Sequence, residues 1–109
     1  MNLCFAMLVP ETYASAEKGK VIFEENCVEC HGERGDGRGA VGPYLEEQRP
    51  ADLLAEKTRA RSNKELFEII QYGVHFEMPG WEGVLSDQEI VNVVKYLRAL
   101  ASASLPAGE

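Results

Sequence analysis

Two cysteines and one histidine in the first third of the chain have the residue types and spacing for covalent attachment of a cofactor. The run Cys27-Val28-Glu29-Cys30-His31 places two thiols three positions apart and an imidazole directly after the second. Residues three apart on a helical turn share a face, so both sulfurs can reach one edge of a flat macrocycle while the imidazole reaches a metal at its centre. The spacing predicts a c-type haem attached through Cys27 and Cys30, with His31 as an iron ligand.

A pair of cysteines at this spacing has two other common uses. A thioredoxin-like redox pair requires a βαβ context, and a zinc site requires a further Cys/His pair. The sequence around Cys27 and Cys30 contains neither pattern. We therefore favour haem attachment over both alternatives.

Length and charge restrict the class of protein. The chain has 109 residues, which fits one domain. With 18 acidic and 11 basic residues its net charge is −7, which argues against a nucleic-acid partner because such a partner requires a basic face. No apolar run approaches the length of a membrane span, so we expect no membrane-spanning segment.

The first 16 residues resemble an export signal. Residues 3–9 are apolar, and residues 14–16 read Ala-Ser-Ala, although no Lys or Arg precedes the apolar run. We expect residues 1–16 to be a short or truncated export signal that is cleaved before Glu17. Attachment of a c-type haem itself implies maturation outside the cytoplasm, so we expect a periplasmic or otherwise exported protein.

Cleavage at that point would leave a short mature chain. Cys4 would be removed, so the two cysteines of the CVECH run would be the remaining thiols and Met78 the remaining methionine. We expect residues 17–101 to form the domain and residues 102–109 to form a flexible tail. A domain of this size has little apolar core, and a large flat cofactor would add buried surface.

Helical periodicity predicts three main helices joined by short turns, and hence an all-α fold. The first helix covers about residues 17–28 and ends at the cysteine pair. Gly19 and Phe23 share one of its faces, and a glycine inside a helix suggests close contact with another element.

The second and third helices begin with capping boxes. Ser62 and Glu65 form the first of these patterns, and Ser86 and Glu89 form the second. Gly73 is expected to end the second helix, whose apolar side chains include Phe67 and Ile70. The apolar stripe of the third helix extends to about residue 101.

A glycine-rich segment follows the CVECH run, with glycines at positions 32, 35, 37, 39 and 42. Its last six residues formally match the dinucleotide-binding fingerprint, which we reject because that motif must follow a strand and open a helix. We expect instead a tight loop whose backbone lies close to a flat ligand.

The segment from Gly73 to Trp81 contains two further side chains that can bind iron. It has neither helical period nor strand alternation, so we expect a loop. Met78 precedes Pro79, which restrains the backbone and can hold a weak thioether ligand in place. His75 is the alternative sixth ligand.

Four basic residues, Lys57, Arg59, Arg61 and Lys64, lie close together in an otherwise acidic chain. Such a cluster is usually a solvated face. It can also pair with haem propionates or with a docking partner.

Taken together, these residues resemble the class I cytochromes c, especially the small bacterial monohaem members. The resemblance covers residues 17 to about 101. It depends on Gly19 and Phe23, the CVECH run at 27–31, Gly42-Pro43-Tyr44-Leu45, Met78-Pro79-Gly80-Trp81, the LSDQEI start of the last helix, and Tyr96-Leu97 within that helix.

The resemblance implies the cytochrome c fold, with three main helices wrapped around one covalently bound haem c. It implies thioether bonds from Cys27 and Cys30, and it implies His31 and Met78 as the axial iron ligands. The Met-Pro context favours Met78 over His75.

It also implies further residues around the haem. The carbonyl of Pro43 would accept a hydrogen bond from His31 and fix its tautomer. Leu45 and Trp81 would line the pocket, and by hypothesis so would Phe67, Ile70 and Leu97. The resemblance also implies that Gly19 and Phe23 meet Val93 and Tyr96 of the last helix.

A haem with both axial positions filled by protein can exchange electrons but has no open site for substrate. The resemblance therefore implies a one-electron carrier rather than an enzyme, with a redox protein as donor and another as acceptor. The basic lysine face of the mitochondrial relatives has no counterpart here.

Two alternatives remain open from the sequence. One is a haem sensor or peroxidase-like protein with a labile sixth ligand. The other is a dedicated electron-transfer subunit of an oxidoreductase complex, in which the same haem would serve a fixed partner. A free carrier would instead be a monomer.

Overall fold

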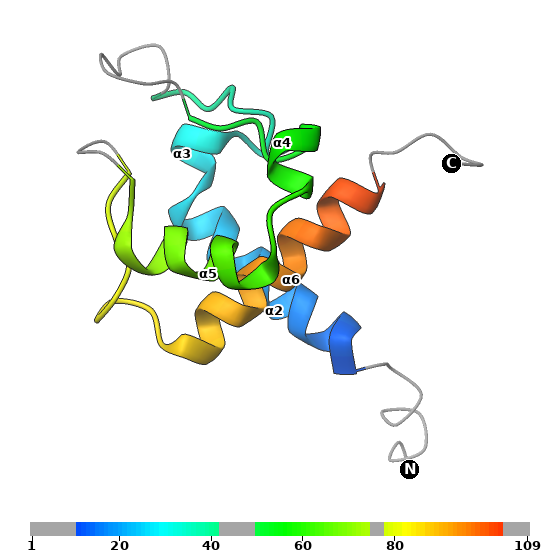
Figure 1. Ribbon diagram of the computed structural model, residues 1–109, viewed down its shortest axis with the longest axis vertical. Helices are drawn as coiled ribbons and strands as arrows, with labels where there is room; N and C mark the ends of the chain where they lie inside the picture. The colour runs from blue at the N-terminus through cyan, green and yellow to red at the C-terminus, as the bar shows by residue number, and fades with distance from the viewer. Residues whose placement is uncertain (1–10, 42–49, 75–77, 104–109) are drawn as a thin grey trace.

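The computed structural model describes residues 11–41, 50–74 and 78–103 of the chain. These residues form helices joined by loops, as Figure 1 shows. The helices are α2 (Glu11–Asn26), α3 (Val28–His31), α4 (Glu56–Arg59), α5 (Asn63–Tyr72) and α6 (Asp87–Ala103). Within these ranges β pairing is limited to two isolated bridges, so the predicted all-α fold is confirmed.

The crossing of α2 and α6 is the most extensive helix contact. Gly19 makes it possible, because a Cβ at this position would overlap the main-chain carbonyl of Asn92. One turn further along, the rings of Phe23 and Tyr96 pack with their centroids 5.4 Å apart. The contact expected for Gly19 and Phe23 with the last helix is therefore confirmed.

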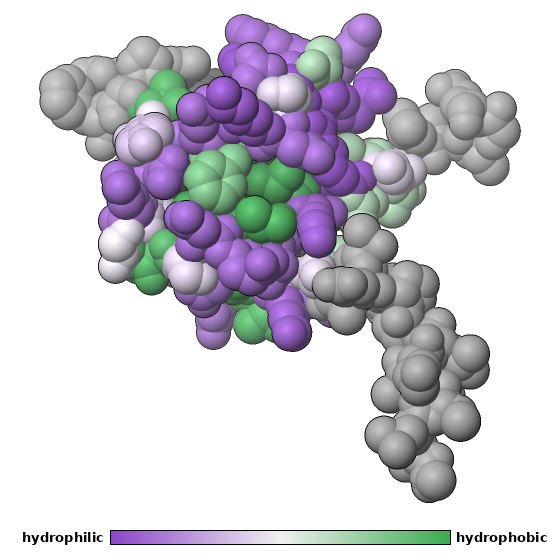
Figure 2. All heavy atoms as spheres, turned by 60° about the horizontal axis from the view of Figure 1, so that its bottom comes forward, coloured by the Kyte–Doolittle hydropathy of each residue, from purple (hydrophilic) through white to green (hydrophobic). Residues whose placement is uncertain are grey.

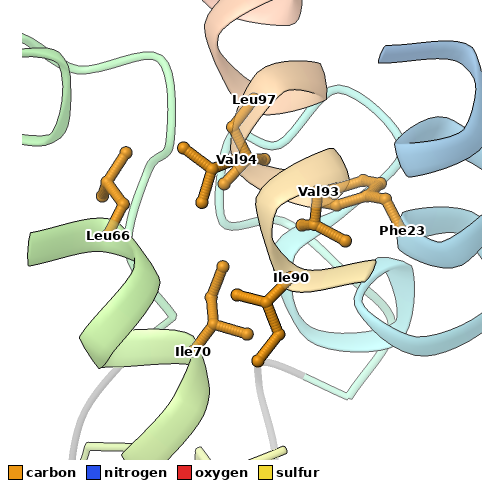
Figure 3. Packing of buried hydrophobic residues seen from close by; sticks show 7 residues of the cluster. All are labelled: Phe23, Leu66, Ile70, Ile90, Val93, Val94 and Leu97. Carbon is orange, nitrogen blue, oxygen red and sulfur yellow. The ribbon is translucent and has the colours of Figure 1, made fainter. Parts of the chain in front are cut away.

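The core lies where α2, α5 and α6 meet (Figure 3). Phe23 of α2 and Ile90 and Val93 of α6 are almost fully buried, with exposed fractions of 1%, 0% and 1%. Burial of a side chain of this size contributes about 1.5–3 kcal/mol. The cluster consists of Phe23, Leu66, Ile70, Ile90, Val93, Val94 and Leu97.

Both predicted capping boxes are present. The Ser62 hydroxyl accepts a hydrogen bond from the Glu65 amide (3.0 Å), and the Glu65 carboxylate accepts one from the Ser62 amide (2.8 Å). Ser86 and Glu89 form the same pair of bonds at 3.1 and 2.9 Å. Gly73 ends α5 with φ +79°, as predicted.

The first helix differs from the prediction in its bounds. It begins at Glu11 rather than Glu17, because residues 11–16 contain neither glycine nor proline to interrupt it. The expected cleavage point after Ala16 therefore lies within α2, and cleavage remains a prediction. None of the described helices combines the length and apolar character needed to cross a membrane.

The chain is acidic, with a net charge of −7. Figure 2 shows one face of the molecule, on which hydrophilic residues surround a small apolar area. Among the described residues, the large apolar side chains with substantial exposure are Val21, Tyr72, Val74 and Val84.

Candidate haem pocket

A cavity of about 380 Å³ lies beside the core, within the ~300–1,000 Å³ range typical of small-molecule sites. It brings together two groups of predicted site residues that are far apart in the sequence. Cys27, Cys30 and His31 line it from the haem motif (residues 27–31), and Met78 and Trp81 line it from the methionine segment (residues 78–82).

The haem motif is held in shape by its own backbone. Cys27 lies between α2 and α3, and its amide donates to the Phe23 carbonyl at 2.8 Å. The His31 amide donates to the Cys27 carbonyl at 2.9 Å, which closes one helical turn. Cys27 and Cys30 are half-buried free thiols, so the predicted placement of both sulfurs and the imidazole at one cavity is observed.

The Cys27 thiol lies in a largely buried environment. Burial raises the pKa of the Cys27 thiol from 9.0 to about 11, and the neighbouring Cys30 adds to the shift. Reactive and metal-binding cysteines lie instead in surroundings that lower the thiol pKa. In addition, no cluster of three or more His, Cys, Asp or Glu side chains suited to a metal ion occurs within the described residues.

His31 is oriented by a backbone carbonyl. Its Nδ1 lies 3.1 Å from the Ala51 carbonyl oxygen. When Nδ1 carries the proton it can donate a hydrogen bond to that oxygen, and Nε2 is then the nitrogen able to bind a metal. Burial lowers the pKa of His31, and the bond to Ala51 opposes this shift. The net effect favours the neutral imidazole, the form that binds a metal.

The family resemblance implied that the Pro43 carbonyl accepts this hydrogen bond, whereas among the described residues the Ala51 carbonyl faces His31. Pro43 and Leu45 lie outside the described residues, so their expected roles are not tested, and the same is true of His75. A backbone carbonyl carries no signature of residue type. Only the fold, which brings residue 51 to the haem motif, reveals the Ala51 partner.

The described part of the glycine-rich loop contacts the haem motif through its backbone. This part, residues 32–41, does not line the cavity and instead packs against the backbone of α3. A Cβ on Gly39 would overlap the Glu29 carbonyl oxygen, and the amides of Gly37 and Gly39 donate to the carbonyls of His31 and Cys30 at 2.8 and 3.1 Å. The glycines therefore allow the loop backbone to lie close to the backbone of the haem motif.

Met78 reaches the cavity from a short antiparallel bridge with Val74. The Val74 amide donates to the Met78 carbonyl at 3.1 Å, and the Met78 amide donates back to the Val74 carbonyl at 3.3 Å. Met78 is half-buried and lines the cavity, while its backbone is paired with that of Val74.

The apolar wall comes from α2, α5 and α6. Ile70 and Leu97 line the cavity as predicted, whereas Phe67 packs against the core and is not among the cavity-lining residues. On α5, Leu66, Ile69 and Ile70 share one face by helical spacing, and Phe67 lies to one side of it. The prediction for Phe67 was therefore wrong because it ignored which face of α5 meets the cavity.

The basic cluster divides into two parts. Lys57 and Arg61 line the cavity, whereas Arg59 donates from Nε to the Leu54 carbonyl at 3.0 Å. Lys64 is exposed on α5. The cavity edge at residues 57–61 is therefore positively charged despite the acidic composition of the chain.

Arg98 of α6 holds this edge in place, a contact that the sequence analysis missed. Its guanidinium donates to the Asn63 side chain at 2.8 Å, to the Arg59 carbonyl at 3.1 Å, and to the Arg61 carbonyl. An arginine beside the apolar stripe of a helix gives no sequence signal for such a role, because two of its three partners are main-chain carbonyls.

Comparison with known proteins identifies the family. Residues 14–97 match the family described as Cytochrome C oxidase, cbb3-type, subunit III. The chain belongs to this family. The donor set at the cavity, two thiols, an imidazole and a thioether among apolar side chains, fits the haem that a cytochrome c family implies.

Individual relatives agree with this assignment. The chain is 34% identical over 87 residues to the cbb3-type cytochrome c oxidase subunit CcoP of Azospirillum brasilense, covering 80% of this chain and 29% of that protein. It is 37% identical over 87 residues to the subunit FixP of Bradyrhizobium diazoefficiens, covering 78% and 27%. The chain thus spans less than a third of these oxidase subunits.

Two further matches extend the comparison. Cytochrome c6 of a Picosynechococcus species is 32% identical over 96 residues, which cover 85% of this chain and 80% of that protein. A chain of the reducing HAO-like protein complex of Kuenenia stuttgartiensis matches in structure with a TM-score of 0.76 and 27% identity, covering 84% of this chain and 46% of that one. The chain is therefore a cytochrome c domain with the all-α cytochrome c fold.

Proposed function

We propose that this cytochrome c domain is a one-electron carrier with a single, covalently bound haem c. Cys27 and Cys30 would form the two thioether bonds, and His31 and Met78 would bind the iron. The observation that carries the proposal is the convergence of these four side chains on one cavity from two distant segments.

When bound, the haem supplies a reversible change between ferrous and ferric iron. The chain's own residues set the conditions for that change. Ala51 keeps His31 oriented, and the thioether of Met78, a soft ligand, favours the ferrous form. Ile70 and Leu97 line the cavity with apolar side chains, and such surroundings would disfavour the additional charge of the ferric form.

Filling both axial positions with protein side chains separates a carrier from a haem enzyme. Neither oxygen nor peroxide would find an open position on the iron, so electron transfer would be the main chemistry. The labile-ligand alternative, a sensor or peroxidase-like protein, would require the Met78 thioether to leave the iron.

The donor and acceptor would be redox proteins outside the cytoplasm. The oxidase subunits among the relatives support a role as an electron-transfer subunit of a larger complex. The match that covers 80% of a cytochrome c6 supports a free carrier. Co-purification of the chain with a larger redox enzyme would favour the subunit arrangement, and a monomer on size-exclusion chromatography would favour the free carrier.

A pyridine haemochrome assay combined with intact-mass measurement tests the proposal. We expect one haem per chain, retained under denaturing conditions, together with a mass that shows whether residues 1–16 have been removed. A matched double variant, Cys27→Ala with Cys30→Ala, is expected to release any haem on denaturation. A colourless wild-type protein would refute the proposal.

Carbon monoxide separates the carrier from the labile-ligand alternative. We expect the reduced protein to bind carbon monoxide slowly and incompletely at neutral pH, because Met78 occupies the sixth position. Rapid, stoichiometric binding by the wild-type protein would instead favour the sensor or peroxidase-like alternative.

A further inference from the structure

Gly73 and Gly80 lie on either side of Met78 at points where the fold leaves no room for a side chain. A Cβ on Gly73 would lie 2.5 Å from the Met78 carbonyl oxygen and 2.6 Å from the Gly80 nitrogen. A Cβ on Gly80 would lie 2.7 Å from the Gln71 oxygen and 2.8 Å from the Tyr72 oxygen. Carbon and carbonyl oxygen atoms normally come no closer than ~3.3 Å.

The methionine segment packs this closely because it caps the end of α5. The Trp81 amide donates to the Ile70 carbonyl at 2.9 Å, and the Glu82 amide donates to the Gln71 carbonyl at 3.1 Å. Carbonyls in the last turn of a helix have no partner within the helix itself. The segment that carries Met78 therefore supplies bonds that α5 needs, and it must lie directly on the helix to do so.

The helix end on which the segment lies is itself fixed. Leu66 and Ile70 of α5 are buried in the core, with exposed fractions of 5% and 8%. Interiors are close-packed, so α5 cannot shift to accommodate a new methyl group without disturbing the core. A side chain at either glycine would therefore displace the methionine segment rather than the helix.

We propose that Gly73 and Gly80 are positioning residues for the iron ligand Met78. Together they let the methionine segment lie directly on the C-terminal turn of α5, from which Met78 lines the cavity and would bind the iron. This inference rests on the proposed ligation by Met78. A thioether is a weak ligand, so a small displacement of its backbone is enough to weaken the bond to iron.

The chain offers a matched control at Gly83. Gly73 and Gly83 both have positive φ, +79° and +83°, but a Cβ on Gly83 meets no described atom within 4 Å. Gly83→Ala thus introduces backbone strain without displacing any neighbour. Gly80 is not among the positive-φ glycines, so Gly80→Ala introduces the displacement without that strain.

The experiment compares the holoprotein with its variants Gly73→Ala, Gly80→Ala and Gly83→Ala. We expect Gly73→Ala and Gly80→Ala to keep covalent haem and helical circular dichroism but to weaken the sulfur-to-iron charge-transfer absorption of the ferric form and lower the reduction potential. Imidazole should bind their ferric forms about tenfold more tightly, which corresponds to ~1.4 kcal/mol. Gly83→Ala should match the wild type in all three measurements.

Wild-type absorption, potential and imidazole affinity in both test variants would overturn the proposal. Equal changes in Gly83→Ala would also overturn it, because they would assign the effect to strain alone. If Gly73→Ala fails to fold, Gly73→Asn replaces it, since asparagine tolerates positive φ. Loss of haem and helicity in Gly80→Ala and in both Gly73 variants would assign the glycines to folding in general and overturn the proposal.

Met78→Ala separates this proposal from the one on which it rests. If Met78→Ala leaves the charge-transfer absorption intact, the proposed ligation itself is wrong. If Met78→Ala abolishes the absorption while both glycine variants retain it, the ligation stands and the positioning role of the glycines is refuted.

Discussion

The haem motif and the methionine segment reach the same cavity by different physical means. Residues 27–31 form a single helical turn, so the positions of Cys27, Cys30 and His31 follow from local backbone geometry. Met78 is instead placed by contacts with Val74 and with the end of α5. The haem motif is therefore positioned by local backbone geometry, whereas the methionine segment depends on its packing against α5.

The largest effect is expected from removing the locally placed ligand. His31→Ala should prevent maturation and yield a chain without covalent haem, because the imidazole would bind the iron next to the attachment points. Visible absorption and the haemochrome assay measure this. Glu29→Ala, an exposed position within the same turn, is the control and should assemble normally. Recovery of a normally assembled His31→Ala protein would contradict the assignment.

The methionine segment should respond differently to loss of its ligand. Met78→Ala should retain covalent haem, because the cysteines are unaffected, while losing the sulfur-to-iron charge-transfer absorption and lowering the reduction potential. The reduced variant should also bind carbon monoxide rapidly. Optical spectroscopy and redox titration measure these changes. An unchanged ferric spectrum would point to His75 as the sixth ligand.

Replacement of Arg98 tests the cavity edge at residues 57–61 without changing either proposed iron ligand. Arg98→Met removes three hydrogen bonds to the segment 59–63. We expect the free energy of unfolding to fall by ~1.5 kcal/mol, the lower end for bonds to charged groups, because the side chain is half-exposed. Denaturant titration measures this loss, and the charge-transfer absorption should be unchanged. A lost absorption with unchanged stability would contradict the prediction.

The smallest effect is expected at the start of α5, the helix that supports the methionine segment. Ser62→Ala removes the capping hydroxyl and should cost about 1 kcal/mol. Thermal unfolding measures it, and Lys64→Ala, which makes no capping bond, is the control. An equal loss in both variants would mean that the cap contributes nothing.

The same capping box predicts a dependence on pH. Hydrogen bonds from the Ser62 amide and hydroxyl hold the pKa of Glu65 below its usual 4.5. A carboxylate with a lowered pKa in the folded state stabilises the protein above its unfolded pKa, and that contribution is lost as pH falls through the folded value. Below about pH 4.5 the stability of the wild type should therefore decline relative to Glu65→Gln, as unfolding curves at several pH values would show.

Sequence reasoning succeeded where residue type alone specifies the structure. Capping boxes, the helix end at Gly73 and the close contact at Gly19 depend on the chemistry of single side chains or on the absence of one. The haem motif belongs to the same class, since its spacing fits one helical turn. The caps, the helix end and the contact at Gly19 are confirmed, whereas haem attachment at Cys27 and Cys30 remains a prediction.

The remaining features depend on main-chain atoms that every residue possesses. The bond from His31 to Ala51, the bonds from Arg98 to residues 59 and 61, and the packing of the glycine-rich loop on α3 all use backbone carbonyls. A sequence pattern cannot distinguish one carbonyl from another. The face of α5 that meets the cavity, which excludes Phe67, likewise required the tertiary structure.

The crossing at Gly19 has a consequence for biosynthesis. It joins positions 19 and 92, and contacts between residues so far apart form late because a long loop must close first. The core can therefore close only after the final helix has been synthesised. If Cys27 and Cys30 bind haem as proposed, both thiols would until then remain accessible for the attachment reaction.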